Sequence, residues 1–221
     1  MKVLVIGASR GIGLEFVRQY RADAASVTAT ARNAEGMARL QAMGTTAFQL
    51  DLLDAASVSG PAWSEDGQTF DVVVCNAGVY GPDTSGLQTP TAADFDAVMQ
   101  TNVFGAMRVL PLLVDKLAPG AKLVVISSKM GSIGKQTTAS GWLYRASKAA
   151  LNSVLRSVSI SLEGKAVCVA FHPGWVQTDM GGAQADLTPE HSVSDMRRVI
   201  KGLRQTDNGR FLNHDGTAID W

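Results

Sequence analysis

Tyr144 and Lys148 are the two side chains in this sequence best suited to move a proton during a reaction. They lie near the start of a strongly helical segment. Residues four apart share one face of a helix, so both can point into one cleft. A phenol ordinarily titrates at about 10, and a neighbouring cation stabilises the phenolate and lowers that pKa. The pair could therefore protonate the alkoxide that forms when a hydride reaches a carbonyl carbon.

Polar residues that end two apolar runs could complete a site around this pair. The run Leu123–Ser128 ends in hydroxyl groups, and the run that begins at Asp71 ends in Asn76. Asn102 stands in an otherwise apolar helical segment. Each has a local alternative, because serine caps helices and asparagine forms turns or bends helices. Occurring together, they favour a site in which Ser128 faces a substrate carbonyl.

A glycine-rich turn follows the first apolar run. Its residues, Gly7 to Gly13, lie between the expected strand Lys2–Ile6 and a helical segment. Glycines permit a tight turn close to a pyrophosphate, and the helix N-terminus presents free N–H groups to the phosphates. The spacing Gly-x-x-x-Gly-x-Gly differs from the standard Gly-x-Gly-x-x-Gly. Its position between strand and helix nevertheless supports a dinucleotide site.

Two arginines bear on which dinucleotide this site would bind. NAD-binding sites place an acidic residue at the end of the second strand, for the ribose 2′-hydroxyl. This sequence has Ala31 and then Arg32 there, and Arg10 lies within the glycine turn. Guanidinium groups form charge-assisted hydrogen bonds with a 2′-phosphate. The alternative is a pair of solvated surface arginines, but the missing acid favours NADPH over NADH.

Alternating strands and helices must position these residues. We expect strands at Lys2–Ile6, Ser26–Ala31, Thr46–Leu50, Asp71–Cys75, Lys122–Ser127, Lys165–Phe171 and Arg210–Asn213, and helices at Gly13–Ala22, Ala34–Met43, Ala92–Leu117, Leu143–Leu162 and Ser192–Leu203. Near-continuous hydrophobic strands are typical of parallel sheets buried on both faces. The pattern predicts a single α/β domain over residues 1–221, a Rossmann-like doubly wound parallel sheet of about seven strands with helices on both faces. Ligands bind such sheets outside the carboxyl ends of the strands.

Taken in order, these motifs resemble the short-chain dehydrogenase/reductase superfamily over the whole chain. The motifs are Gly7-x-x-x-Gly11-x-Gly13, Asp51-Leu52, Asn76-Ala77-Gly78, Asn102, Ser128, Tyr144-x-x-x-Lys148 and His172-Pro173-Gly174 through Thr178. Two further segments, Gly174–Gly181 and Gly209–Gly216, resemble the small carbonyl reductases of the Sniffer and C-factor type.

The resemblance implies a role for each matched residue. Tyr144 would be the acid/base, and Lys148 would lower its pKa and hold the nicotinamide ribose. Ser128 would bind the substrate carbonyl, and Asn102 would anchor a water of the proton relay. The resemblance also implies a homo-oligomer, dimer or tetramer, and no metal. The residues implied in cofactor binding are Gly7, Ser9, Arg10, Gly11, Ile12, Gly13, Arg32, Asp51, Leu52, Asn76, Ala77, Gly78, Tyr144, Lys148, Pro173, Gly174, Val176 and Thr178.

The sequence departs from the family pattern around its serines. Ser128 lies 16 residues before Tyr144, a longer spacing than is usual in the family, and Ser132, at 12 residues, is a rival for the oxyanion role. We favour Ser128 because it directly ends the fifth strand, and expect residues 133–141 to form a longer loop at the substrate mouth. Ile6 and Cys75 replace a usual Thr and Asn at packing positions, so we expect cofactor binding to be retained.

Composition excludes several other classes of protein. The 20 basic and 20 acidic residues cancel and are scattered, unlike those of a nucleic-acid binder or a polybasic membrane-surface protein. No apolar run approaches the roughly 20 residues that span a bilayer, and the first is too short for a secretory signal. Cys75 and Cys168 lie in strand-like apolar runs, where free core thiols are usual. We therefore expect a cytoplasmic protein with no nucleic-acid or membrane partner.

The sequence thus predicts an oxidoreductase that transfers a hydride from NADPH to a small aldehyde or ketone. An NADP-binding signalling or regulatory protein of C-factor type is an alternative. An NAD-dependent alcohol dehydrogenase is another, which Arg32 disfavours. Residues 179–194 are expected to cover the substrate. This segment is short, contains Gly181 and Gly182 and has few bulky apolar groups, which predicts an open or mobile lid.

Overall fold

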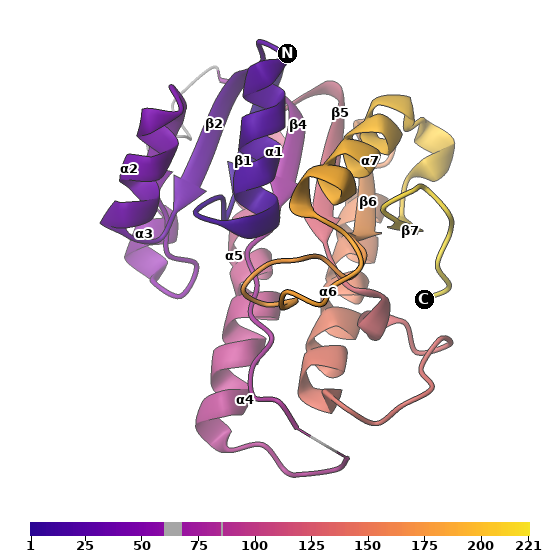
Figure 1. The fold of residues 1–221 in the computed structure, drawn as a ribbon. Coiled ribbons are helices and arrows are strands. Elements are labelled where there is room, and N and C mark those ends of the chain that lie inside the picture. The colour runs from indigo at the N-terminus through magenta and orange to yellow at the C-terminus, as the bar shows by residue number, and fades with distance from the viewer. Residues whose placement is uncertain (60–67, 85) are drawn as a thin grey trace.

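Seven parallel strands form one sheet in the computed structural model, which describes residues 1–59, 68–84 and 86–221 (Figure 1). The order across the sheet is β3-β2-β1-β4-β5-β6-β7. Because the chain moves outward in both directions from β1, the strand order reverses between β1 and β4, and doubly wound sheets bind ligands at that point. The strands are β1 (Lys2–Ile6), β2 (Ser26–Ala31), β3 (Thr46–Gln49), β4 (Phe70–Cys75), β5 (Leu117–Ile126), β6 (Ala166–His172) and β7 (Arg210–Asn213).

The central strands are largely apolar because both faces of the sheet are covered. In β1, Val3 and Val5 belong to one buried cluster, whereas Leu4 and Ile6 belong to a second cluster on the opposite face. All four side chains are 0–1% exposed. Successive side chains of a strand point to opposite faces, so a sheet with two cores requires apolar residues at every position. The fold class expected from the sequence is confirmed.

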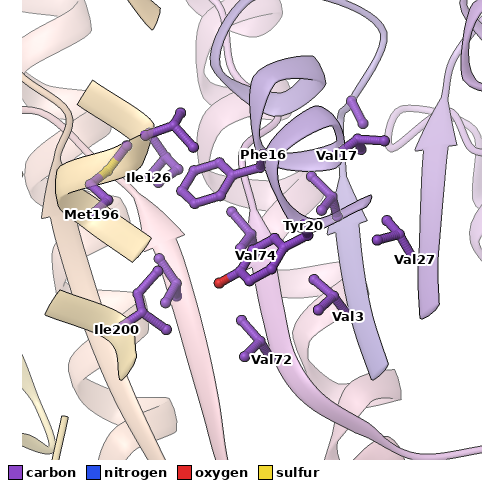
Figure 2. Packing of buried hydrophobic residues seen from close by; sticks show 14 of the residues in the cluster. Val3, Phe16, Val17, Tyr20, Val27, Val72, Val74, Ile126, Met196 and Ile200 are labelled. Atoms are coloured by element: carbon purple, nitrogen blue, oxygen red, sulfur yellow. The ribbon is translucent and has the colours of Figure 1, made fainter. Parts of the chain in front are cut away.

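Helices form the two outer layers. On one face, Phe16 and Tyr20 of α1 pack in the same cluster as Val74 of β4 and as Met196 and Ile200 of α7 (Figure 2). The other face is covered mainly by α5 and α6, whose buried leucines join the second cluster. The α-helices are α1 (Gly11–Ala22), α2 (Ala34–Ala42), α3 (Ala55–Ser59), α4 (Ala92–Met99), α5 (Gly105–Leu113), α6 (Trp142–Ser161) and α7 (Pro189–Gly202).

Two boundaries differ from the expectation in ways that affect the site. The predicted helix Ala92–Leu117 consists of α4, a π-helical turn at Gln100–Phe104, α5 and a 3₁₀ turn, and β5 then starts at Leu117. The helix α7 begins earlier than expected, at Pro189. Thr188 caps it, accepting a hydrogen bond from the N–H of His191 (3.3 Å), and proline is favourable at a first helical position.

The continuous helical stretch Ala92–Lys116 also bears on the expectation of no membrane span. Its 25 residues and a window of mean hydropathy 1.3 satisfy the length and composition of a span, and 44% of that window is buried within this protein. Val109, Leu110 and Leu113 pack in the core on the α5–α6 face. A core helix of a soluble protein passes the same test, so this stretch is weak support for membrane insertion.

Candidate active site

The helix α6 places Tyr144 and Lys148 on its buried face, where they are 8% and 3% exposed. The ammonium nitrogen of Lys148 lies 5.6 Å from the centre of the Tyr144 ring and donates a hydrogen bond to the carbonyl of Ile126 (3.0 Å). Ile126 ends β5, so the contact ties the lysine to the carboxyl edge of the sheet. The spacing of four thus brings both groups to one side of the helix.

Burial dominates the ionisation of both groups. Burial raises the pKa of Tyr144 to about 12. A hydrogen bond with Ser128 acts in the opposite direction, and the neighbouring Tyr80 adds a smaller increase. Burial lowers the pKa of Lys148 to about 8. The sequence predicted that Lys148 would lower the Tyr144 pKa. In this structure burial of the phenol is the largest influence on its pKa, and the phenol is protonated at neutral pH; the effect of Lys148 on it stays a prediction.

Ser128, and not Ser132, lies at Tyr144. Ser128 follows β5, forms the hydrogen bond with Tyr144 and accepts another from the N–H of Met130 (3.2 Å). The Ser132 side chain is 1% exposed and donates to the carbonyl of Asp220 (2.5 Å), in the C-terminal segment. The geometry therefore favours Ser128 as the serine that meets a substrate oxygen.

Asn102 lies in the π-helical turn and connects two parts of the site. Its side-chain oxygen accepts from the N–H of Val79 (2.8 Å). Its amide nitrogen donates to the carbonyl of Val79 (2.8 Å) and to the hydroxyl of Ser147 (2.9 Å). The side chain thus joins the segment after β4 to α6. The predicted role of Asn102 in a water relay stays a prediction. Single π turns inside α-helices are frequent at functional sites.

The glycine turn fits a bound pyrophosphate. Gly7 has a φ of +79°, and a Cβ there would lie 2.7 Å from the backbone nitrogen of Ala77. The side chain of Asn76 donates to the carbonyl of Gly7 (2.8 Å), which joins the end of β4 to the turn. The N-terminus of α1 carries no side-chain cap and no acidic residue in its first turn. Its amides are therefore available to a phosphate.

The residues expected at the adenosine end occupy three different environments. Ala31 is buried at the end of β2, and Arg32 after it is exposed. Asp51 accepts a hydrogen bond from the N–H of Leu53 (3.0 Å), and Leu52 is buried. Arg10 forms an ion pair with Asp179 (Nη1–Oδ2 2.6 Å), and its expected contact with a 2′-phosphate stays a prediction.

The segment after β6 crosses the glycine turn. Thr178 lies against this turn, since a Cβ on Gly11 would lie 3.2 Å from the Thr178 methyl group. Val176 is 4% exposed and pairs with Leu187. The carbonyl of Pro173 accepts from Ser192 of α7 (2.5 Å). Within the segment expected to cover the substrate, residues 189–194 belong to α7 and residues 179–188 form a loop.

Tyr80 was not singled out from the sequence, although it touches the centre of the site. Its ring lies 4.7 Å from that of Tyr144, centre to centre, at an interplanar angle of 37°. It follows Asn76-Ala77-Gly78 by two residues, and an aromatic residue so close to that motif was the available signal. Ser147, the partner of Asn102, lies one residue before Lys148 and gave no signal.

Comparisons with known proteins agree with this arrangement. The sequence matches the short-chain dehydrogenase family over residues 1–188. C-signal from Myxococcus xanthus is 41% identical over 154 residues, which make up 68% of this chain and 92% of that protein. A structure of NADPH-bound carbonyl reductase from chicken fatty liver is 32% identical, with a TM-score of 0.86 over 100% of this chain and 98% of that one. The carbonyl reductase Sniffer of D. melanogaster is 28% identical, with a TM-score of 0.86 over 100% and 99%. The chain therefore belongs to the short-chain dehydrogenase/reductase family and resembles its Sniffer and C-factor types.

Proposed function

We propose that the protein transfers a hydride from NADPH to an aldehyde or ketone and that Tyr144 protonates the resulting oxygen. The observation that carries the proposal is the buried group of Tyr144, Lys148 and Ser128 where β5 and α6 meet. The glycine turn supports the cofactor part, because its glycines and uncapped helix N-terminus suit a dinucleotide pyrophosphate. Bound NADPH would supply the hydride.

Each side chain has a distinct task in this reaction. The Ser128 hydroxyl donates a hydrogen bond to the carbonyl oxygen and stabilises the negative charge that develops on it. The phenol of Tyr144, protonated at neutral pH, gives its proton to that oxygen. Lys148 then stabilises the phenolate that remains, since a nearby cation favours the charged form. Asn102 holds the segment after β4 against α6 and keeps the walls of the site in place.

The choice of NADPH over NADH rests on charge. No carboxylate stands at Ala31 to accept from a ribose 2′-hydroxyl, and the exposed Arg32 that follows can bind a 2′-phosphate. Arg10 is the second cation within the same region. The NADPH-bound chicken reductase, with a similar fold over the whole chain, supports the same choice.

A signalling role without turnover is the second candidate function, and the similarity to C-signal favours it. Such a role would require NADP binding but not proton transfer. The protonated Tyr144 beside Ser128 supports the enzyme, because a binding protein has no use for a proton donor at this position.

Replacement of Tyr144 by Phe tests the proposal, with Tyr20→Phe, in the core near α7, as the control. NADPH and NADH oxidation is followed with a panel of small aldehydes and ketones, and NADPH binding by fluorescence. We expect Tyr144→Phe to lose nearly all turnover and keep its NADPH affinity, and Tyr20→Phe to keep both. Activity of Tyr144→Phe within about tenfold of the parent, a change of only about 1.4 kcal/mol, would exclude Tyr144 as the proton donor. Binding of NADPH by the parent without turnover of any carbonyl would favour the signalling role.

A further inference from the structure

The ion pair between Arg10 and Asp179 joins two parts of the chain that lie 169 residues apart. Arg10 immediately precedes α1, at the glycine turn, and Asp179 immediately follows Thr178, in the loop 179–188. We propose that Asp179 competes with the cofactor 2′-phosphate for Arg10 and so sets how strongly the protein distinguishes NADPH from NADH. This inference rests on the proposed function, in which Arg10 and Arg32 recognise that phosphate.

The two partners that we propose for Arg10, Asp179 and the 2′-phosphate, lie on opposite sides of the glycine turn. Ser9 faces α2 and the end of β2, because a Cβ on Gly36 would lie 2.8 Å from the Cβ of Ser9 and 2.8 Å from that of Ala31. Gly11 faces Thr178 on the other side of the turn. The Arg10 side chain is directed to this second side, where it meets Asp179. To reach a phosphate at the end of β2 it must leave Asp179.

Asp179 is the acidic partner of Arg10 within the described ranges, and the other acids of the same groove are already paired. Glu15 binds Arg18 (2.6 Å), and Glu190 lies 3.9 Å from Arg18. The side chains of Arg10 and Asp179 are 69% and 74% exposed, so water and a phosphate can both reach the guanidinium group. A dianionic phosphate is a stronger partner for arginine than one exposed carboxylate, so the exchange is favourable when the cofactor binds.

The loop does not depend on this ion pair for its conformation. Its backbone is held by hydrogen bonds from the N–H of Gly182 to the carbonyl of Thr178 (2.8 Å) and from the N–H of Gln177 to the carbonyl of Leu187 (2.8 Å). Replacement of Asp179 by Asn therefore releases Arg10 and leaves the loop folded.

Binding of 2′,5′-ADP and 5′-AMP to the protein without cofactor, measured by calorimetry, tests the competition. The first ligand carries the 2′-phosphate, the second lacks it, and neither carries nicotinamide. Because exposed ion pairs are weak, we expect Asp179→Asn to tighten 2′,5′-ADP by about two- to fivefold and to leave 5′-AMP unchanged. The effect should diminish as salt rises. Asp186→Asn is the matched control, since Asp186 is exposed in the same loop and forms no ion pair with a described residue.

A double-variant cycle separates competition for Arg10 from general repulsion. In the Arg10→Ala background, Asp179→Asn should no longer change 2′,5′-ADP binding. The competition is overturned if Asp179→Asn fails to tighten 2′,5′-ADP, if Asp186→Asn tightens it equally, or if the effect persists without Arg10. A parent that binds both ligands equally would instead show that the NADPH preference of the proposed function is wrong, and the competition with it.

Discussion

The phenol of Tyr144 and the ammonium group of Lys148 lose most of their contact with water in the same place, and the loss acts on them in opposite directions. Tyr144 is held in its protonated form, which is the form that a proton donor requires. Lys148 keeps its charge at neutral pH only against a cost of burial, which its hydrogen bond to the carbonyl of Ile126 partly offsets. The protein therefore gives up stability at this lysine to keep a cation beside the phenol.

Because burial of the charged Lys148 ammonium group costs free energy, the effect of Lys148→Met on stability should depend on pH. Folding lowers the Lys148 pKa from 10.5 to about 8, so between these values the unfolded chain binds a proton that the folded protein lacks. The free energy of unfolding of the parent, relative to the variant, should rise with pH across this window and be constant below it. The rise should reach about 3 kcal/mol, since each pKa unit corresponds to about 1.4 kcal/mol.

Urea unfolding of the parent and of Lys148→Met at several pH values from 7 to 10.5 measures this difference. Titration of the buried cysteines, and of tyrosines other than Tyr144, is common to both proteins and cancels. Lys201→Met, at an exposed position at the end of α7, is the control. A parent–variant difference that stays flat with pH would contradict the lowered Lys148 pKa.

Ser128 and Ser132 give a second prediction about single residues. Ser128→Ala should lower kcat by about 10²–10³, because the hydroxyl that meets the oxyanion is lost. Ser132→Ala should leave kcat near that of the parent, because its hydroxyl is bonded to the carbonyl of Asp220 in the C-terminal segment. Steady-state kinetics with NADPH and one good carbonyl substrate decide the point, and the reverse order would assign the oxyanion role to Ser132.

The sequence was sufficient to name these side chains but not to describe their surroundings. Spacing placed Tyr144 and Lys148 on one helix face, and the end of an apolar run placed Ser128 at the sheet edge. Two things depend on chain segments that meet only after folding: the contact of Tyr80 with Tyr144 and the ion pair of Arg10. No local pattern encodes such contacts.

At the scale of elements, the π-helical turn between α4 and α5 is the irregularity that serves the site. A π turn adds a residue to an otherwise regular helix, and here it contains Asn102, whose hydrogen bonds to Val79 and Ser147 connect three segments. The sequence predicted one uninterrupted helix because apolar periodicity over 25 residues hides a single extra residue. Most strands were located well, since most are short, near-continuous apolar runs, but β5 starts earlier than expected, at Leu117. The five-residue α3 was too short to show a period.

Asn102→Ala should therefore lower the free energy of unfolding by about 1–3 kcal/mol, because partly buried backbone groups of Val79 lose their partners. Urea unfolding measures the change, and Gln100→Ala, exposed in the same turn, is the control. If Asn102→Ala unfolds within about 0.5 kcal/mol of the parent, as a typical surface substitution does, the turn does not hold these segments together.

For the molecule as a whole, one helical face is left uncovered. Phe104, Met107 and Val114 are 43%, 51% and 38% exposed, and their spacing puts them on one side of the helical stretch Ala92–Lys116. These three residues form an apolar stripe, and they contribute to the high hydropathy of the helical stretch Ala92–Lys116. The net charge of zero adds no overall repulsion between copies. The family resemblance predicts a dimer or tetramer, and this face offers apolar side chains that such an interface would bury.

We therefore expect the protein to self-associate through this stripe. Phe104→Ser combined with Met107→Ser removes the two largest exposed apolar groups on the stripe, and should shift the equilibrium toward monomer at micromolar concentration. Ile133→Ser is the matched control, because Ile133 is 75% exposed but lies in the loop after β5. Sedimentation equilibrium over a range of concentrations measures the mass of each protein, and circular dichroism checks that the double variant is folded. A parent that stays monomeric at the highest concentration would exclude the oligomer. An oligomer that the double variant leaves intact, or that Ile133→Ser dissociates, would place the interface elsewhere on the molecule.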